Sequence, residues 1–426
     1  MKKPKFQRPT GMHDILPEDQ GYFQKIYNVC ETVANFYGFK KIDTPILEDT
    51  ALYEKGTGLA TDIVQKQMFT LRTKGGNYLT LRPEFTPGII RAYLEHGMQT
   101  LPQPIKLYSS GPAFRYEHPQ AGRYRQFHQF NLEVIGDGNS VIDAQVIQIF
   151  YNILTEIKLK KLIVEINSIG DNQCRPYYKK LLVSYFKSRY SSLCLDCRRR
   201  LKENPLRVLD CKEEKCQRIV SQAPQIIDHL CQECHDHFKG VLEFLDEIEL
   251  PYRLNPYLVR GLDYYTKTVF EIFEDTEEGR KMGSLSGGGR YDALVKLLGG
   301  EDTKAIGGAM GIERVIATIK SKKIKTQKPS NPPIFLAQLG IMAKRKSLKL
   351  LEDFRKVKIQ VAESFGRDSL KAQLKIADRL GVKYTLLLGQ KEVLEGTVII
   401  RDMQIGRQET VKLEKVVREM QKRLKK

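Results

Sequence analysis

Three arginines stand beside turns or glycine-rich segments where a nucleotide could approach the backbone closely: Arg115, Arg260 and Arg314. Glycine leaves room for such an approach, and a guanidinium group donates paired hydrogen bonds to an oxyanion. No GxxxxGKS/T segment occurs, and the glycine run 286–291 lacks the lysine and hydroxyl residue that a P-loop requires. Together the arginines indicate phosphate chemistry that does not use a P-loop.

A predicted β-hairpin would position the first of these arginines. Residues 105–117 and 125–135 have the alternation of strands, and a basic loop joins them. Because successive strand residues point to opposite faces, Gln129 and Glu133 share a polar face while their neighbours face a core. A sheet floor that holds Arg115, a glutamine and a carboxylate could recognise a zwitterion beside a phosphate. The alternative is a solvated outer face of the sheet.

The composition favours a soluble protein with a polyanionic partner. Its 426 residues carry 70 Lys and Arg against 51 Asp and Glu, a formal net charge of +19. With 41% hydrophobic residues, this excludes a collagen-like, wholly disordered or coiled-coil protein. The charge favours RNA, DNA or an acidic membrane surface, and a merely basic enzyme is the alternative. No segment approaches the ~20 apolar residues of a membrane span, and the N-terminus lacks a signal-peptide pattern, so we expect a cytoplasmic protein.

Changes of composition predict the domain boundaries. Residues 319–333 carry five lysines and three prolines with little to bury, which is typical of a linker. Beyond it, short apolar runs alternate with amphipathic segments, which predicts a small α/β domain with a mostly parallel sheet. Its expected strands are 334–337, 359–361 and 384–388, and its expected helices lie around 345–356 and 369–380. The predicted order is the first part of a larger α+β domain at 1–170, a mostly helical, Cys-rich insertion at 171–250, the second part at 251–318, the linker at 319–333 and the final domain at 334–426.

The cysteines are concentrated in the predicted insertion, since seven of eight fall between 174 and 234. Two CxxC pairs have a spacing that fits tetrahedral zinc, and Cys211 and Cys216 form a further pair between them. The candidate zinc ligands are Cys194, Cys197, Cys231 and Cys234. Disulfides are disfavoured in a cytoplasmic chain. The alternative to a structural zinc is a set of free thiols on helices.

Several segments resemble the signatures of one enzyme family. Motifs 1, 2 and 3 of class II aminoacyl-tRNA synthetases are resembled by residues 37–48, 114–129 and 307–314, in that order. Two segments specific to the histidine enzyme are resembled by residues 260–265 and 288–292. The anticodon-binding domain of that enzyme is resembled by residues 369–378. Over essentially its whole length the chain resembles a bacterial-type histidyl-tRNA synthetase. The resemblance implies an α+β fold: a class II antiparallel-sheet catalytic domain with a mostly helical insertion, and a C-terminal α/β anticodon-binding domain.

The resemblance also implies an activity and its partners. The enzyme would activate L-histidine with ATP and Mg²⁺ to histidyl-adenylate and pyrophosphate, and then transfer histidine to the 3′ end of tRNA(His). Motif 1 implies a homodimer. A catalytically silent paralogue, the regulatory subunit of a histidine-biosynthetic phosphoribosyltransferase, is one alternative, but such proteins generally lack the domain expected at 334–426. A pure RNA-binding module is another, and it gives no reason for the polar face of the hairpin.

Site residues follow from the motifs of the family. Arg115 and Arg260 would be catalytic residues at the α-phosphate, and ATP would be bound by Arg115, Glu117 and Arg314. Histidine would be bound by Glu84, Thr86, Gln129, Glu133, Arg260, Tyr264, Tyr265 and Tyr291, and tRNA would be contacted by Arg123 and Arg125. Within that pocket, Glu84 and Gln129 would hold the ammonium group, and Glu133 and Tyr265 the imidazole. Core packing is the alternative for Tyr264.

The motif 2 loop departs from the family pattern at one position, and this generates a prediction. Where the family reads Glu-Arg-Pro-Gln, this chain has His118, so a permanent cation is replaced by a side chain with a reference pKa of ~6.5. We expect aminoacylation by the parent protein to fall more between pH 6 and 8 than aminoacylation by His118→Arg. Identical pH profiles of the two proteins would contradict a pH-sensitive contact at this position.

Overall fold

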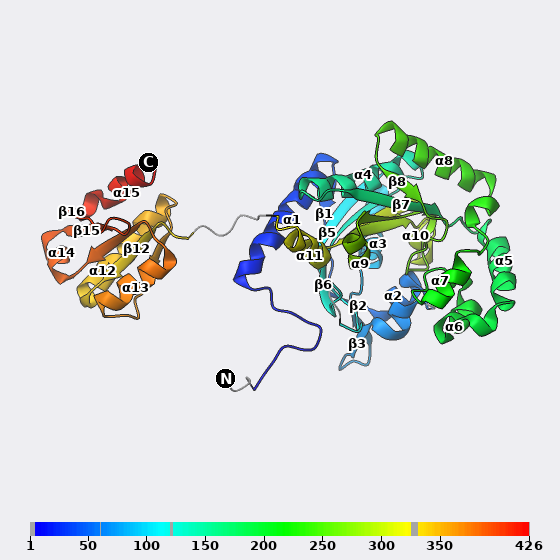
Figure 1. The fold of residues 1–426 in the computed structure, drawn as a ribbon, viewed down its shortest axis with the longest axis horizontal. Coiled ribbons are helices and arrows are strands. Elements are labelled where there is room, and N and C mark those ends of the chain that lie inside the picture. The colour runs from blue at the N-terminus through cyan, green and yellow to red at the C-terminus, as the bar shows by residue number, and fades with distance from the viewer. Residues whose placement is uncertain (1–4, 60, 120–121, 325–330, 426) are drawn as a thin grey trace. The chain divides into compact units, whose positions relative to one another are not determined.

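The computed structural model describes residues 5–59, 61–119, 122–324 and 331–425 (Figure 1). The chain forms two compact units, Met1–Thr326 and Gln327–Lys426. The division falls within the predicted linker at 319–333, of which residues 325–330 lie outside the described residues, as does Gln120 of the motif 2 segment. Among the described residues, no helix has the length and apolar character needed to span a bilayer.

An eight-stranded sheet organises the first unit. Its six central strands run antiparallel, while the short edge strands β1 and β8 pair in parallel with β5 and β7. In their order across the sheet, the strands are β1 (Lys40–Lys41), β5 (Ile105–Phe114), β6 (Gln126–Ile135), β11 (Ala305–Gly311), β10 (Ser286–Arg290), β9 (Thr266–Glu274), β7 (Leu162–Ser168) and β8 (Tyr252–Leu254). The antiparallel sheet of an α+β fold is therefore present, as the sequence predicts.

One face of this sheet is covered by helices. They are α1 (Pro17–Phe36), α4 (Ser140–Glu156), α8 (Gln232–Glu247) and α11 (Ile312–Ser321). Their apolar side chains form one core with Phe130, Leu132 and Val134 of β6, all of which are fully buried. Figure 1 shows α4 and α8 side by side, in agreement with their direct packing. The opposite face carries Glu133 together with apolar side chains such as Leu107 and Val269, which belong to a second core.

The predicted hairpin forms, with shorter strands than the pattern indicates. β5 ends at Phe114 and β6 begins at Gln126, and the register pairs Leu107 with Glu133. Beyond the strand ends, the backbone N–H of Arg115 still donates to the carbonyl of Arg125 at 2.9 Å. The period of two therefore places residues correctly on the two faces, although Arg115 itself lies just outside the regular strand.

The remaining elements of the first unit surround the polar face and its edges. A three-stranded sheet contains β2 (Leu47–Asp49), β3 (Phe69–Arg72) and β4 (Tyr78–Leu81), and the helices nearby are α2 (Thr50–Thr57), α3 (Thr86–Glu95), α9 (Glu277–Met282) and α10 (Leu294–Leu297). Between β7 and β8 the chain is helical, with α5 (Arg175–Lys187), α6 (Leu195–Glu203) and α7 (Glu214–Val220) preceding α8. A second core runs from α3 through the tyrosines of residues 264–291 into these helices.

The second unit contains a five-stranded sheet of mixed direction. Its strands, in order, are β13 (Val361–Glu363), β12 (Ile334–Gln338), β14 (Tyr384–Leu388), β15 (Thr397–Asp402) and β16 (Gln408–Lys412). Its helices are α12 (Gly340–Lys356), α13 (Leu370–Leu380), α14 (Gln390–Glu395) and α15 (Val416–Lys425). The three predicted strands form the parallel part. The antiparallel pair β15 and β16 was not predicted, and it makes the sheet less parallel than expected.

The close contact of β10 with β11 generates a prediction about stability. A Cβ added at Gly288 would lie well inside contact distance of the carbonyl of Gly307 and 2.5 Å from Cα of Gly308. We expect Gly288→Ala to lower the free energy of unfolding of the first unit by roughly 1–3 kcal/mol or more, because the two strands must separate. Thermal unfolding measures this, with Gly75→Ala as control, since a Cβ there meets only Thr73 Oγ1 at 3.8 Å. Equal losses in both variants would contradict the prediction.

Candidate active site

The glycines of β10 and β11 form the floor of the candidate site. Gly289 pairs with Gly307 in the register of the two strands. A Cβ at Gly307 would collide with the carboxylate of Glu133, and one at Gly289 would lie 3.0 Å from the Tyr265 ring. Because these positions carry no side chain, the neighbouring carboxyl and phenol groups can lie flat on the sheet. The glycine run noted in the sequence therefore makes space above a sheet and does not form a phosphate loop.

Glu133 of β6 is fully buried above this floor. Its Oε1 accepts a hydrogen bond from Thr86 Oγ1 at 2.6 Å, and its Oε2 accepts one from the Tyr291 hydroxyl. Burial raises the pKa of Glu133 from its ordinary 4.5 to about 8, against the opposing effect of these two donors. Because this pKa lies near neutral pH, a small change in the surroundings is enough to protonate or deprotonate the carboxyl group. It can then donate a hydrogen bond in the protonated form or accept one in the ionised form.

A second buried carboxyl group, that of Glu84, lies beside the first. Its two oxygens accept hydrogen bonds from Thr57 Oγ1 at 2.8 Å and from the Tyr264 hydroxyl at 2.7 Å. Burial raises the pKa of Glu84, while the two hydrogen bonds and the positive charges of Arg115 and Arg260 limit the rise. Glu84 thus lies within the electrostatic reach of two of the three arginines that the sequence singled out.

The tyrosines connect the two carboxyl groups into one pocket. The ring centroid of Tyr264 lies 4.7 Å from that of Tyr265 and 5.7 Å from that of Tyr291. Burial raises the pKa of Tyr264 and of Tyr291 well above the usual range, so both hydroxyls remain protonated donors to the carboxylates. Tyr264 is buried in the core and its hydroxyl is satisfied by the Glu84 carboxylate, which agrees with the core-packing alternative.

The third arginine joins the same cluster of charges. Arg115 Nε donates to the Pro83 carbonyl at 2.9 Å, and Arg314 Nη1 donates to the Ser284 carbonyl at 2.6 Å. Burial lowers the pKa of Arg314, and the guanidinium groups of Arg123 and Arg115 lower it further. Cations that are held close together and partly buried are stabilised by an anion, which makes this corner suitable for phosphate groups.

Two polar atoms in the pocket have no protein partner. Arg260 is ion-paired with Glu271 through Nη1, and its guanidinium lies 5.8 Å from the centre of the Tyr265 ring. Its Nε is nevertheless buried without a hydrogen bond, and so is Oε1 of Gln129. Buried polar groups are normally satisfied. The Arg260 Nε donor and the Gln129 Oε1 acceptor are therefore available to a polar ligand.

Comparison with known proteins gives the pocket its context. The histidyl-tRNA synthetase family profile matches residues 11–170 and 198–315, and the anticodon binding domain profile matches residues 334–423. The histidine–tRNA ligase of Dehalococcoides mccartyi strain 195 is 43% identical over 419 residues, which is 98% of this chain and 100% of that protein.

The chain belongs to the histidyl-tRNA synthetase family.

Other members agree with this assignment. The histidine–tRNA ligase of Desulforamulus reducens is 43% identical over 96% of this chain and 97% of its own length. The crystal structure of the apo histidyl-tRNA synthetase of S. aureus is 36% identical, with a TM-score of 0.79, and the match covers 97% of this chain and 99% of that one. The family resemblance, the fold class and the ligase class of enzyme expected from the sequence are confirmed.

The arginines of the motif 2 loop lie at the rim of the pocket of this family member. Arg123 is half exposed and 3.9 Å from Glu117. The Arg125 guanidinium lies 3.8 Å from the centre of the Tyr116 ring, and its Nε donates to the Glu117 carbonyl at 3.2 Å. Glu117 and both arginines therefore border the cationic corner that contains Arg314, which also interacts electrostatically with Glu117 and Arg123.

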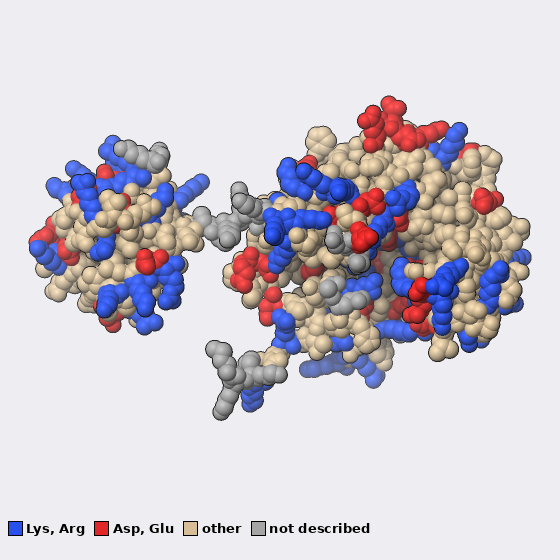
Figure 2. Space-filling view, viewed as in Figure 1, with Lys and Arg blue, Asp and Glu red and all other residues tan. Residues whose placement is uncertain are grey.

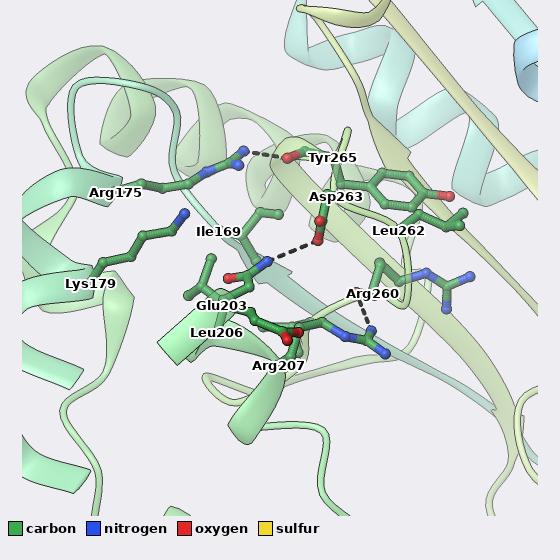
Figure 3. A pocket seen from close by; sticks show the side chains of 12 residues that line it. Ile169, Arg175, Lys179, Glu203, Leu206, Arg207, Arg260, Leu262, Asp263 and Tyr265 are labelled. Atoms are coloured by element: carbon green, nitrogen blue, oxygen red, sulfur yellow. Dashed lines mark hydrogen bonds between the residues drawn. The ribbon is translucent and has the colours of Figure 1, made fainter. Parts of the chain in front are cut away.

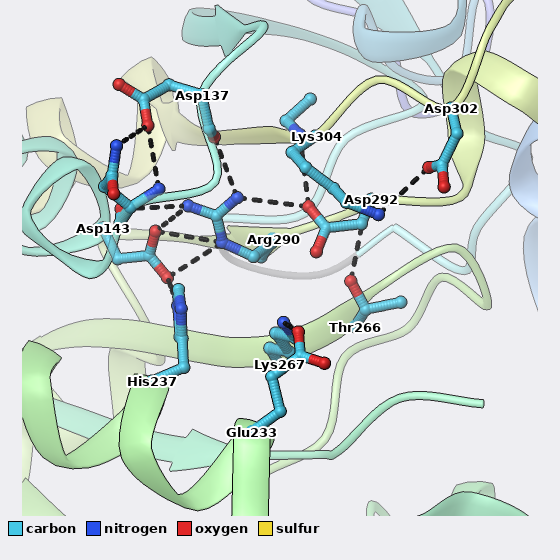
Figure 4. A network of polar contacts seen from close by, with 12 residues as sticks. Asp137, Asp143, Glu233, His237, Thr266, Lys267, Arg290, Asp292, Asp302 and Lys304 are labelled. Atoms are coloured by element: carbon cyan, nitrogen blue, oxygen red, sulfur yellow. Dashed lines mark hydrogen bonds and ion pairs between the residues drawn. The ribbon is translucent and has the colours of Figure 1, made fainter. Parts of the chain in front are cut away.

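A buried ion-pair network supports the histidine-specific segment 288–292, and sequence reasoning missed it (Figure 4). Arg290 is fully buried, and its Nε donates to both carboxylate oxygens of Asp143 at 3.1 and 3.2 Å. Its Nη1 donates to Asp292 at 3.1 Å, and Asp143 also pairs with His237 at 2.8 Å. Arg290 thereby fixes the backbone on which Tyr291 reaches Glu133. The sequence did carry a signal for this network, because Arg290 is a charged residue within a glycine-rich strand.

A cavity of about 180 Å³ lies beside the pocket, between the helical insertion and residues 259–265 (Figure 3). Arg175 donates to the carbonyl of Tyr265, and Arg207 Nη1 donates to the carbonyl of Arg260 at 3.0 Å. Asn204 Nδ2 donates to Asp263 Oδ1 at 2.8 Å. The insertion therefore holds the histidine-specific loop from outside, a role that no motif indicated.

The cysteines do not form the single zinc site that the sequence suggested. Cys194 and Cys197 lie with Cys211 and Cys216, whereas Cys231 and Cys234 lie with Cys174 and Asp171. The two CxxC pairs therefore belong to different clusters. The spacing within each pair was a correct signal of proximity, but sequence cannot reveal which pairs meet in space.

The raised pKa of Glu133 generates a prediction. The folded protein retains this proton up to about pH 8, while an unfolded glutamate loses it near 4.5, so stability falls as pH rises through that window. The contribution is at most roughly 1.4 kcal/mol per pH unit. We expect Glu133→Gln to flatten the fall in stability between pH 5 and 8.

Thermal unfolding at several pH values measures this effect, with the exposed Glu247→Gln as the matched control. Parallel curves for Glu133→Gln and the parent would show that the buried carboxyl group does not titrate in this way.

Proposed function

We propose that this chain joins histidine to tRNA(His), and that histidine binds above the glycine floor between the carboxyl groups of Glu84 and Glu133. The observation that carries the proposal is the pair of buried carboxyl groups beside three arginines in one pocket. A free amino acid supplies an ammonium group for one carboxylate and a carboxylate for the cations. The 43% identity to curated histidine–tRNA ligases over 98% of the chain supports the same conclusion.

Recognition of the side chain rests on Glu133. A neutral imidazole has one nitrogen that donates and one that accepts, and Glu133, with a pKa near 8, can adopt the matching form. Tyr265, within the same ring cluster, would complete this contact. An amino acid without such a pair would leave buried polar groups unsatisfied, which is costly and therefore selective.

Recognition of the ammonium group rests on Glu84 and Gln129. The cation would favour the ionised form of Glu84, which burial disfavours. The orphaned Oε1 of Gln129 is an acceptor for one ammonium proton. Thr86 and Tyr291 then act by holding Glu133, and Tyr264 by holding Glu84.

The arginines would position ATP. The histidine carboxylate attacks the α-phosphorus, a new O–P bond forms, and the bond to the leaving pyrophosphate breaks. Arg115 and Arg260 would bind the α-phosphate and the attacking carboxylate, while Arg314 and Glu117 would bind other parts of the nucleotide. Both reactants are anions, so cations on either side align them and stabilise the charge of the transition state. The terminal hydroxyl of tRNA then attacks the histidyl carbonyl, and AMP leaves.

The residues present also fit ATP with Mg²⁺. The crowded cations and the orphaned Nε of Arg260 suit phosphate oxygens, and Glu271 and Glu117 offer the carboxylate oxygens that Mg²⁺ prefers. When bound, the ion neutralises charge on the triphosphate.

The second unit and the basic surface would bind tRNA. The anticodon binding domain profile covers nearly all of the second unit, and Figure 2 shows patches of Lys and Arg on the visible face of each unit, with Asp and Glu among them. Arg123 and Arg125 are placed to meet the acceptor end as it enters the pocket. The presence of this domain disfavours the regulatory paralogue. We further propose a cytoplasmic homodimer with the domain boundaries given above.

Pyrophosphate exchange with each of the twenty amino acids tests the proposal. We expect exchange with histidine alone, because the pocket pairs an imidazole with buried polar groups. Arg260→Lys should lower the histidine-dependent rate by roughly 10²–10³-fold, since one positioned donor to the reacting centre is lost. Arg253→Lys, half exposed on β8, is the matched control and should keep the parent rate. Exchange with another amino acid at a similar rate would overturn the assignment of the pocket.

A further inference from the structure

Two compact groups of metal-ligand side chains lie in the helical insertion, away from the pocket. The first contains Cys194, Cys197, Cys211 and Cys216. The second contains Asp171, Cys174, Cys231 and Cys234. In each group, the potential ligand atoms all lie within 4.8 Å of one another, and none of the cysteines forms a disulfide. Together they use seven of the eight cysteines of the chain and leave only Cys30 in the core.

The spacing in the first group matches a tetrahedral ion. A Zn–S bond of about 2.3 Å places the sulfurs of a tetrahedron roughly 3.8 Å apart. The Sγ atoms of Cys194 and Cys211 are 3.8 Å apart. In a cubane iron–sulfur cluster each thiolate binds a different iron, which spreads the sulfurs more widely than a single ion does. Four sulfurs gathered this closely therefore indicate one ion with four thiolate ligands.

Backbone amides point at the sulfurs in both groups. The N–H of Cys197 donates to Cys194 Sγ at 3.4 Å, and the N–H of Cys194 donates to Cys216 Sγ at 3.3 Å. In the second group, the N–H of Cys231 donates to Cys174 Sγ at 3.0 Å. Such donors stabilise the thiolate form that a metal ion requires, and they orient the ligands around it.

The second group has an oxygen ligand in place of a fourth sulfur. Asp171 follows β7, and its Oδ1 accepts hydrogen bonds from the N–H groups of Gln173 at 2.9 Å and of Cys174 at 3.4 Å. These bonds fix the carboxylate beside the three sulfurs. Zinc binds carboxylate oxygens together with cysteine sulfurs in proteins, with Zn–O distances of about 2.0–2.2 Å.

We propose that the insertion binds two structural zinc ions, one through Cys194, Cys197, Cys211 and Cys216, and one through Asp171, Cys174, Cys231 and Cys234. The second site joins the start of α5, the first helix of the insertion, to the start of α8, its last helix. The first site joins α6 to the segment before α7 and to α7 itself.

The architecture of the insertion explains why such cross-links are needed. Its α6 has 9 residues and α7 has 7, a three-residue 3₁₀ turn precedes α6, and a four-residue 3₁₀ turn lies between α6 and α7. Isolated helices shorter than about 12 residues are marginal in water. The first ion would cross-link α6, the segment before α7 and α7, and the second would join α5 to α8, so that both add to the stability that core packing gives the insertion.

Each site supports one side of the histidine-specific loop. Next to the second site, Arg175 donates to the Tyr265 carbonyl, and Glu233 pairs with Lys267 at 2.6 Å. Next to the first, α6 and the following turn hold the loop through Arg207 to the Arg260 carbonyl and through Asn204 to Asp263. The zinc sites therefore position Arg260 and Tyr265 without contacting a substrate.

The metal content of the unmodified full chain tests the proposal directly. The protein is purified without a metal-binding tag or chelator, kept reduced, and dialysed against zinc-free buffer. Elemental analysis should then find two zinc ions per chain. No metal, or iron in place of zinc, would overturn the proposal, and one zinc would overturn it for one site.

Single substitutions assign the ligands. Cys216→Ser and Cys234→Ser should each lose one zinc ion, from the first and second site respectively, while Cys30→Ala should keep both. Retention of both ions in either serine variant would overturn the ligand assignment. For a variant that does not fold, cobalt replaces zinc in the unmodified protein: the visible absorption of tetrahedral cobalt thiolate supports the sites, and its absence overturns them.

The positioning role has a separate readout, and only this part rests on the proposed function. Cys234→Ser should raise the KM for histidine in pyrophosphate exchange several-fold more than it lowers kcat, because Tyr265 loses its support while the arginines near ATP remain. An unchanged KM in a variant that has lost one zinc ion would overturn the positioning role and leave the metal count standing. Failure of exchange in the parent would instead count against the proposed function.

Discussion

The burial of two carboxyl groups on a floor of glycine is the constraint on which the rest of the catalytic unit depends. Removal from water makes ionisation of Glu84 and Glu133 costly, and the pocket compensates with hydroxyl donors from Thr57, Tyr264 and Tyr291. Burial raises the pKa of the Tyr264 and Tyr291 hydroxyls, which keeps these two donors protonated. Under the proposed function, an ammonium group and an imidazole would offset the remaining cost, and an amino acid without them would not, which would make the cluster selective for histidine.

The hydroxyl donors must be held in position, and buried residues of the core hold them. Tyr291 follows Arg290, whose guanidinium is fully buried and paired with Asp143 on α4, which also pairs with His237 on α8. Removal of one partner from a buried pair typically costs about 3–5 kcal/mol, because the other charge is left alone. The hydrogen bond to Glu133 is therefore maintained by helices on the opposite side of the sheet.

Much of this arrangement could be predicted from sequence, and the failures share a cause. Strand alternation placed Glu133 and Gln129 on the polar face, because a period of two is a local property of the backbone. The three arginines were grouped by their position beside turns and glycines, whereas their individual roles came only from the family resemblance. Pairing of the CxxC segments was predicted wrongly, and Arg290 was not recognised as an ion-pair centre, because both depend on which distant segments meet. Nor did local pattern reveal β15 and β16, whose short, partly exposed strands carry weak alternation.

The insertion supports the candidate active site through direct contacts, although it carries none of the class II motifs. The loop that bears Arg260, Tyr264 and Tyr265 rests on the glycine floor on one side, where it can form few side-chain contacts because the floor has no side chains. Its other side must therefore be held by something else, and Arg175, Asn204 and Arg207 provide those contacts from the insertion. The glycines of β10 and β11 leave space above the sheet but offer the loop few side-chain contacts. Contacts from the helical insertion are therefore needed to hold the loop in position.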